Sequence, residues 1–377
     1  MHPRAEMMSA PKHKLLIFEL RMLGDSVLAI PFVRSAKKKY EVYVCCTSQS
    51  SHLFELVLPR DHILEWTPPW HAEYGKYRFS VWRNSRTLSL IRKIRGFRFA
   101  VVVSSWADAR IHALMRFSGI RKRIGFPMTT CNYLASDRPW RRKQLLAGRS
   151  ASSVLAVLSL APLLTRPLHR HNYSQHHLED WRQIADELQI RWDLTAPWIK
   201  VDSPITKTTF ADVRKIARHR SPDKGLWVIH PGARLPSKTW NIADFQNLID
   251  EVFTPKNIPV LVIDVPESEP LQLRSSLQTK VRTPHLRDLV WVVQQCDSVL
   301  CNDSVTSHLG SALGKKVVAI FGSGNPDWFA PYGNEDLVVQ AGACKSHPCM
   351  DRCVMDSHIC LDSITPDMVR TKVSKLL

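Results

Sequence analysis

The sequence is poor in the features that mark several large classes of protein. It has only 14 glycines in 377 residues, and they nowhere form the Gly-x-Gly-x-x-Gly pattern of dinucleotide-binding dehydrogenases. No apolar run approaches the roughly 18 residues that a membrane-spanning helix needs. The apolar stretch from Leu15 to Phe18 is too short for the core of a signal peptide. We therefore expect neither a dehydrogenase, nor an integral membrane protein, nor a secreted protein.

Cysteine is too sparse for a disulfide-stabilised scaffold, because only nine occur in the whole chain. A reducing, cytoplasmic compartment is the simplest interpretation. Four of the nine nevertheless form a cysteine cluster with the spacing C-x4-C-x3-C-x6-C near the C-terminus: Cys344, Cys349, Cys353 and Cys360. Thiolates at this density suit a structural zinc or iron ion. The spacing differs from that of a paired zinc finger, so reduced free thiols are the alternative.

Acidic residues are scarce in the N-terminal half of the chain. Residues 1–200 hold 32 Lys and Arg against 15 Asp and Glu, whereas residues 201–377 hold 20 against 19. A surplus of 17 positive charges (32 minus 15) predicts that the N-terminal half meets an acidic partner. Nucleic acid, anionic lipid and a phosphorylated or carboxylated glycan all fit this surplus, as does a basic face that serves only solubility.

Short apolar segments alternate with amphipathic segments along both halves. The segments that we predict as strands include residues 14–20, 40–46, 97–104, 226–229, 260–264 and 317–321. Such alternation is typical of parallel sheets flanked by helices. We therefore predict two doubly wound α/β domains, an N-terminal domain over residues 1–200 and a C-terminal domain over residues 201–377. The active site is expected between them.

A carboxylate lies where the first predicted strand passes into the first predicted helix. The turn reads RMLGDS over residues 21–26, and the helix is predicted from Val27 onward. Open α/β sheets bind their ligands at this edge, beyond the carboxyl ends of the strands. Asp25 could serve there as a general base, or it could simply cap the helix.

The loop after the strand at 226–229 resembles a phosphate-binding loop. It reads HPGARLPSKTW over residues 230–240, which nearly spells a P-loop but lacks its second glycine. Pro236 also removes an amide that the phosphate cradle would need. We therefore predict no nucleotide triphosphatase, while Gly232 and Lys238 remain candidates for binding a diphosphate.

A second polar loop follows the apolar residues 299–301. Asn302, Asp303 and Ser304 lie there ahead of a predicted helix, and the free amides at a helix N-terminus attract anions. An ordinary capped α/β crossover would have the same sequence. His308, near the start of this helix, is either a ligand contact or a structural residue.

With these segments identified, the chain resembles glycosyltransferase family 9, the heptosyltransferases of lipopolysaccharide inner-core assembly. The resemblance covers roughly residues 14–375, and its motifs occur in the family's order. They are RMLGDSV with Pro31, RKRIGF at 121–126, HPGA through KTW at 230–240, NDS through HL at 302–309, ALG at 312–314, FG at 321–322 and PYG at 331–333. The family usually has glycine where this chain has Val305, which leaves the identity of the donor open.

The resemblance implies a GT-B fold, in which two Rossmann-like domains face each other. The N-terminal domain would hold the acceptor, and the C-terminal domain would hold the nucleotide sugar, with ADP-heptose favoured. Asp25 matches the family's catalytic aspartate and would be the base of an inverting transfer. The donor would be bound by Gly232, Lys238, Asp303, Ser304 and His308. No catalytic metal is implied, although some members have similar cysteine clusters near the C-terminus.

The basic half of the chain is the acceptor half of this arrangement. We therefore expect an acidic glycolipid acceptor, such as the lipopolysaccharide inner core, with Arg121 and Arg123 as candidates for binding it. The protein would be cytoplasmic and peripheral to the anionic inner membrane, and nucleic acid is not an expected partner. Three alternatives remain open: another nucleotide-sugar donor, a protein acceptor, and a non-enzymatic basic binding module on a degenerate GT-B scaffold.

Overall fold

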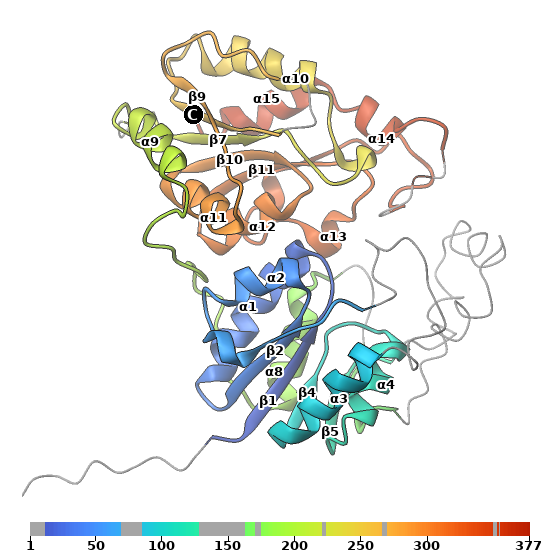
Figure 1. Ribbon diagram of the computed structural model, residues 1–377. Helices are drawn as coiled ribbons and strands as arrows, with labels where there is room; N and C mark the ends of the chain where they lie inside the picture. The colour runs from blue at the N-terminus through green and yellow to red at the C-terminus, as the bar shows by residue number, and fades with distance from the viewer. Residues whose placement is uncertain are drawn as a thin grey trace, which may run out of the picture.

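The protein consists of two α/β domains stacked one above the other (Figure 1). The computed structural model describes residues 12–68, 85–127, 163–169, 175–220, 224–265, 270–349, 353 and 355–377. Each domain is built on one six-stranded sheet, and the paired strands of both sheets run parallel. The predicted α/β class is therefore confirmed.

The first sheet has the strand order β3-β2-β1-β4-β5-β6. The elements of this domain are β1 (Lys14–Glu19), α1 (Leu23–Lys37), β2 (Glu41–Cys46), α2 (Ser48–Phe54), η1 (Arg60–His62), β3 (Ile63–Glu65), α3 (Ser85–Phe97), β4 (Val101–Val103), α4 (Ala109–Phe117), β5 (Lys122–Gly125), β6 (Arg166–Pro167) and α8 (Leu178–Glu187). The chain winds outward from β1 to β3 and then crosses back to β4 on the other side of β1. This crossing is the topological switch point of the sheet.

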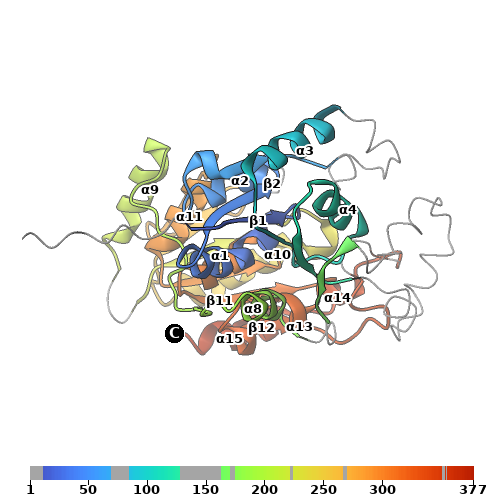
Figure 2. The ribbon, with the colours of Figure 1, turned by 90° about the horizontal axis from the view of Figure 1, so that it is seen from below.

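Alternation along β1 assigns its side chains to two different cores. Leu15 and Ile17 lie in the core that includes α1 and α8, whereas Leu16 and Phe18 lie in the core that includes α3 and α4. Figure 2 shows these two pairs of helices on opposite sides of β1. Because both faces of the sheet are covered, the central strands are apolar along almost their whole length.

The second sheet has the order β12-β11-β10-β7-β8-β9, which, taken from its other end, repeats the order of the first. Its domain contains α9 (Lys207–Ala217), β7 (Trp227–His230), η5 (Pro236–Lys238), α10 (Ile242–Leu248), η6 (Ile249–Phe253), β8 (Val260–Ile263), β9 (Gln278–Val281), α11 (Leu286–Gln295), β10 (Ser298–Asn302), α12 (Val305–Ala312), β11 (Lys316–Phe321), α13 (Pro326–Phe329), η7 (Glu335–Leu337), β12 (Val338–Gln340), α14 (Ile359–Asp362) and α15 (Pro366–Ser374). Here the switch point lies between β7 and β10.

One hydrophobic core extends from the first domain into the second. Val27 of α1 and Leu53 of α2 belong to the same buried group as Trp291 of α11 and Leu309 of α12. Figure 1 shows α1 and α2 directly below α11 and α12, in agreement with the packing of α1 on α12 and of α2 on α11. The two domains are therefore joined by packed apolar side chains as well as by the chain itself.

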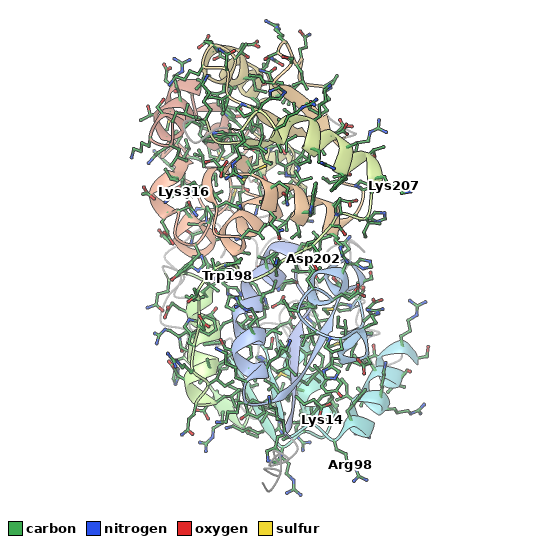
Figure 3. The ribbon with its side chains drawn as sticks, turned by 90° about the vertical axis from the view of Figure 1, so that its left-hand side faces the viewer. Lys14, Arg98, Trp198, Asp202, Lys207 and Lys316 are labelled. Atoms are coloured by element: carbon green, nitrogen blue, oxygen red, sulfur yellow. The ribbon has the colours of Figure 1, made fainter. Side chains whose placement is uncertain are left out.

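The segment between α8 and α9 runs along this junction. The backbone N–H of Trp198 donates to the carbonyl of Ala312 at 2.6 Å, and its indole donates to the carbonyl of Leu194 at 2.9 Å. Figure 3 shows Trp198 and Asp202 at the level where the domains meet. The domain boundary at residue 200 stays a prediction, and it falls between the last strand of the first sheet and the first strand of the second.

The first helix differs from its predicted start. Helix α1 begins at Leu23 and not at Val27, so it includes Asp25 in its first turn. In the second domain, α10 is followed directly by the π-helix η6. None of the helices in the described part of the chain is both long and apolar enough to cross a membrane.

Candidate active site

The loop after β1 lies at the interface between the domains. Lys14, at the start of β1, lies at the far end of the first domain in Figure 3, so the strand runs toward the second domain. At the two switch points, the flanking loops follow β1 and β4 in the first domain and β7 and β10 in the second. Doubly wound sheets bind ligands at such points.

Asp25 lies in the first turn of α1, directly after the loop that follows β1. Its Oδ2 accepts a hydrogen bond from the backbone N–H of Met22 at 3.1 Å, so this carboxylate does cap the helix. Burial raises the pKa of Asp25, and the charges of His177, Arg21 and Lys238 oppose that rise. A carboxylate whose pKa is raised toward neutrality is a better proton acceptor, so capping does not exclude a role as base.

A second carboxyl group, that of Glu19, lies at the end of β1. It is fully buried, and its Oε1 accepts from the backbone N–H of Arg21 at 3.2 Å. Burial, together with the negative charge of Asp25, raises the pKa of Glu19 to about 8. Two neighbouring carboxyl groups with displaced pKa values are frequent at functional sites, where one is kept protonated by the other.

His308 of the second domain fills the space next to Gly24 of the first. A Cβ atom on residue 24 would lie only 2.8 Å from Cδ2 of His308, which leaves no room for a side chain. His308 is 4% exposed, and within the described residues its Nδ1 has no hydrogen-bond partner. Burial and the positive charges nearby lower the pKa of His308 to about 3, so its ring is neutral at physiological pH. A neutral ring with an unbound nitrogen suits a ligand contact.

Lys238 and Asp303 form an ion pair at the switch point of the second domain. Their Nζ and Oδ2 atoms are 2.9 Å apart, and the side chains are 18% and 6% exposed. Lys238 ends η5 after β7, and Asp303 directly follows β10. The structure thus brings together two residues that the sequence suggests separately. The charge of Lys238 also lowers the pKa of Asp25, so it acts across the domain interface.

Asn302 holds the two loops of this switch point together. Its Oδ1 accepts from the backbone N–H of Trp240 at 3.1 Å, and its Nδ2 donates to the carbonyl of Pro231 at 2.6 Å. The loop after β11 joins them, because the N–H of Ser323 donates to the carbonyl of Ser237 at 3.0 Å. These bonds fix the position of the Lys238 loop relative to α12.

Gly232 and Ser304 border the same loops. A Cβ atom on Gly232 would lie 2.8 Å from Cγ2 of Val265, so close packing explains the glycine. Ser304 is the N-cap residue of α12, and within the described residues its buried hydroxyl has no hydrogen-bond partner. A helix N-terminus next to an unbound hydroxyl can bind an anionic group.

Comparison with known proteins places these features in a family. The model of glycosyltransferase family 9 (heptosyltransferase) matches residues 155–358, which is more than half of the chain. The chain belongs to glycosyltransferase family 9. It is 20% identical over 350 residues to lipopolysaccharide heptosyltransferase 3 of Escherichia coli, with 88% of this chain and 90% of that protein covered.

Solved structures confirm the GT-B fold of this family 9 protein. A family 9 glycosyltransferase from Veillonella parvula matches with a TM-score of 0.64 and 15% identity, covering 98% of both chains. The E. coli heptosyltransferase WaaC with ADP matches with a TM-score of 0.63 and 14% identity, covering 97% of this chain and all of that one. The protein is accordingly a glycosyltransferase, and the fold predicted from its motifs is confirmed.

The two arginines suggested for acceptor binding differ in their surroundings. The guanidinium of Arg123 donates to the carbonyls of Leu163 and Ile120, both at 2.7 Å, and to that of Arg121 at 3.2 Å. Only 9% of Arg123 is exposed, so its charge is used within the first domain. Arg121 is exposed, and acceptor binding stays a prediction for it.

The cysteine cluster lies after β12, around α14. Burial and the other three thiols of the cluster raise the pKa of Cys349 to about 12. Among the described residues, no three His, Cys, Asp or Glu side chains are grouped tightly enough to hold a metal as they stand. The thiols are close enough to repel one another when ionised, and a cation would relieve that repulsion. The structural zinc or iron ion therefore stays a prediction.

The structure adds four residues that the sequence does not indicate. Glu19 ends an apolar strand, and Trp106 follows β4, whose place beside β1 only the sheet order reveals. His176 and His177 directly precede α8. Their one sequence signal is the His-His pair before an amphipathic helix, which by itself has no specific meaning. They lie at the site because α8 packs against α1.

Proposed function

We propose that this glycosyltransferase transfers heptose from ADP-heptose to an acidic acceptor of the lipopolysaccharide inner core, with inversion at the anomeric carbon. The observation that carries the proposal is the close packing of Gly24, beside Asp25 at the first switch point, against His308 of α12, at the second. One domain supplies a base and the other a partner for the diphosphate, as a direct displacement requires.

Asp25 would act on the acceptor. Its carboxylate would take the proton of an acceptor hydroxyl while the hydroxyl oxygen attacks the anomeric carbon of the donor. Among the described residues only the Met22 N–H binds this carboxylate, and it binds Oδ2, so Oδ1 is the oxygen that would receive the proton. The raised pKa brings the proton affinity of Asp25 closer to that needed at neutral pH.

The second domain would bind the departing diphosphate. Lys238 would supply positive charge, and the N-terminal amides of α12 would supply hydrogen-bond donors, with Gly232 and Ser304 beside them. Asp303 would orient Lys238 through their ion pair, and Nδ1 of the neutral His308 would contact the donor. These groups together would stabilise the leaving group without a catalytic metal.

The choice of substrates has separate support. WaaC is described with ADP and with ADP-2-deoxy-2-fluoro heptose, which favours an ADP-sugar in a related fold. The 17 surplus positive charges of residues 1–200 favour an acidic acceptor in the first domain. A lipid-linked acceptor would require the protein to work at the surface of the inner membrane, from the cytoplasmic side.

The donor is tested first, by thermal stabilisation. ADP-heptose, UDP-sugars and GDP-sugars are each added to the purified protein, since a ligand that binds only the folded state raises the melting temperature. We expect ADP-heptose and ADP to give the largest rise. A larger rise with a UDP- or GDP-sugar would contradict the donor but leave the transferase reaction intact.

The base is tested by turnover. Release of ADP from ADP-heptose, in the presence of heptose-deficient lipopolysaccharide, should fall on the order of a hundredfold to ten-thousandfold in Asp25→Asn. Its affinity for ADP should be retained. Asp186→Asn, which removes an exposed carboxylate of α8, is the matched control and should behave like the wild type. Near wild-type kcat in Asp25→Asn would rule out Asp25 as the base.

A further inference from the structure

A buried His–Asp pair lies next to Asp25, and the reaction proposed above does not use it. His177 is fully buried and Asp180 is 4% exposed. Nδ1 of His177 is 3.0 Å from Oδ2 of Asp180, one turn into α8. On the other side of the ring, Nε2 lies 3.4 Å from the hydroxyl oxygen of Ser105, in the loop after β4. The imidazole is therefore held in one orientation by its two nitrogens.

One indole ring connects His177 to the turn that contains Asp25. The ring centroid of Trp106 lies 4.7 Å from that of His177 and 4.2 Å from the guanidinium carbon of Arg21. Arg21 belongs to the loop between β1 and α1, four residues before Asp25. His177 and the Asp25 turn are thus packed against the same side chain at the switch point of the first domain.

His177 is also attached to the second domain. Its backbone N–H donates to the carbonyl of Trp328, the third residue of α13, at 3.0 Å. The neighbouring His176 makes a second link, because its Nε2 donates to the carbonyl of Ala330 at 2.9 Å while its Nδ1 accepts from the N–H of Leu178 at 3.2 Å. Both domains therefore fix the position of His177 next to the active site.

Electrostatics agrees with this geometry. Burial raises the pKa of Asp25, and of the groups that lower it again, His177 has the largest effect, ahead of Arg21 and Lys238. The other titratable groups around Asp25 and His177 are Glu19 from β1, Asp180 from α8, His176 beside His177, and His308 from α12 of the second domain. Of the histidines named here, His177 is the one whose ring is bound to a carboxylate, that of Asp180.

We propose that His177 is a positioning residue of this glycosyltransferase: held by Asp180 and packed with the Asp25 turn against Trp106, its imidazole favours the carboxylate form of Asp25, which accepts the proton. The inference rests on the role of Asp25 proposed above. His177 itself does not touch the substrate in this scheme. It sets the pH range over which Asp25 can act.

The test compares His177→Gln with the wild type in the pH dependence of kcat/KM. Losing the electrostatic interaction with His177 should move the acidic limb of the profile to higher pH by about one unit. On the acidic side of this limb the variant should then be roughly tenfold slower, while at the alkaline plateau it approaches the wild type, and KM for ADP-heptose should not change. Asp180→Asn should move the limb in the same direction.

His112→Gln is the matched control, because His112 is a fully buried histidine in the same domain, whereas His177 and not His112 is among the principal groups that shift the pKa of Asp25. The acidic limb of the kcat/KM profile of His112→Gln should lie at the same pH as in the wild type, even if the variant is less stable. A loss of equal size at every pH in His177→Gln would mean that His177 is only structural, and that result would overturn the proposal. If His177→Gln does not fold, the pH profile of Asp180→Asn becomes the test. An acidic limb at the wild-type pH in Asp180→Asn would then overturn the proposal as well.

A second readout separates this inference from the proposed reaction. The Asp25 carboxyl carbon can be titrated by NMR in the full-length protein labelled at aspartate, with its signal identified by its absence in Asp25→Asn. Its midpoint should lie at higher pH in His177→Gln than in the wild type, whether or not ADP-heptose is the donor. If the wild type does not turn over ADP-heptose, the proposed donor fails, whereas an unchanged midpoint in His177→Gln refutes the role of His177.

Discussion

Gly24 of the first domain and His308 of the second lie so close together that residue 24 has no room for a Cβ atom. The added carbon would lie 2.8 Å from Cδ2 of His308. Gly24 is inside α1 and does not adopt a positive φ, so its backbone would accept any residue. The glycine is therefore required by the other domain and not by the helix.

The first prediction is that Gly24→Ala destabilises the protein. Helix propensity alone would favour alanine by about 1 kcal/mol, whereas overpacking costs typically about 1–3 kcal/mol. We expect the clash to prevail, because the ring of His308 is buried and has little space to move into. Thermal and urea unfolding of the variant measure the difference.

Gly96→Ala supplies the control for this prediction. Gly96 also lies in a helix, α3, but nothing lies within 4 Å of a Cβ placed there. That variant should be as stable as the wild type or more stable. Combining Gly24→Ala with His308→Ala should recover part of the loss. If Gly24→Ala alone proved more stable than the wild type, His308 would not be held where the structure has it.

The second prediction concerns the ion pair between Lys238 and Asp303 at the proposed donor site. Lys238→Ala should weaken ADP binding by about 1.5–3 kcal/mol, because a charge-assisted bond to the diphosphate is lost. The carboxylate of Asp303 would then face the diphosphate without its partner. Calorimetric titration with ADP measures the effect, and Lys256→Ala, an exposed lysine of the same domain, is the control. Unchanged affinity would mean that the diphosphate binds elsewhere.

The third prediction follows from the buried carboxyl group of Glu19. Its pKa rises from an ordinary 4.5 to about 8 on folding, so the folded state holds this proton more tightly than the unfolded state does. The stability that the proton contributes is fully present below pH 4.5 and is lost as the pH rises toward 8. The loss amounts to at most about 5 kcal/mol, since one pKa unit corresponds to about 1.4 kcal/mol.

Glu19→Gln removes this titration while keeping the shape of the side chain. The variant should match the wild type near pH 4.5 and exceed it in stability at pH 8, as measured by urea unfolding across that range. Glu179→Gln, at a partly exposed position of α8, should show no such divergence. Parallel stability curves for Glu19→Gln and the wild type would contradict a protonated Glu19.

The fourth prediction concerns the cysteine cluster. Protein purified without chelators should contain about one equivalent of zinc or iron, because four thiolates can hold an ion that organises a loop with little core of its own. Cys353→Ser should lose it. Cys296→Ser, a change outside the cluster, should retain it, and a serine there can still donate to the carbonyl of Val292. Elemental analysis below about a tenth of an equivalent in the wild type would favour free thiols.

Periodicity and motifs were sufficient to predict the fold and the loops of the site. Strands with both faces covered are conspicuous in a sequence because they are apolar throughout, and the segments that directly follow them contain Asp25, Lys238 and Asp303. The alternation in both halves also predicted the two domains, and the family resemblance added that they face each other. Which loops meet in space depends on strand order, which the sequence pattern does not predict and the structure supplies.

The environment of Asp25 could not be predicted in the same way. Trp106, His177 and Glu19 come from three separate segments and influence Asp25 only through tertiary packing. For Arg123, the basic motif suggested a contact with the acceptor. The structure instead shows its guanidinium donating to backbone carbonyls. Local sequence does not distinguish the buried Arg123, within β5, from the exposed Arg121, directly before that strand. The basic residues Arg138, Arg141, Arg142 and Lys143 lie outside the described residues.

The apolar core that continues from α1 and α2 into α11 and α12 has a consequence for how the protein unfolds. Neither half could be released without exposing to water the side chains that it buries in the other. Heating should therefore melt both halves in one cooperative calorimetric peak rather than in two. For the same reason, fragments separated near residue 200 should be poorly soluble when expressed alone, and should become soluble when co-expressed, because each provides the missing surface of the other.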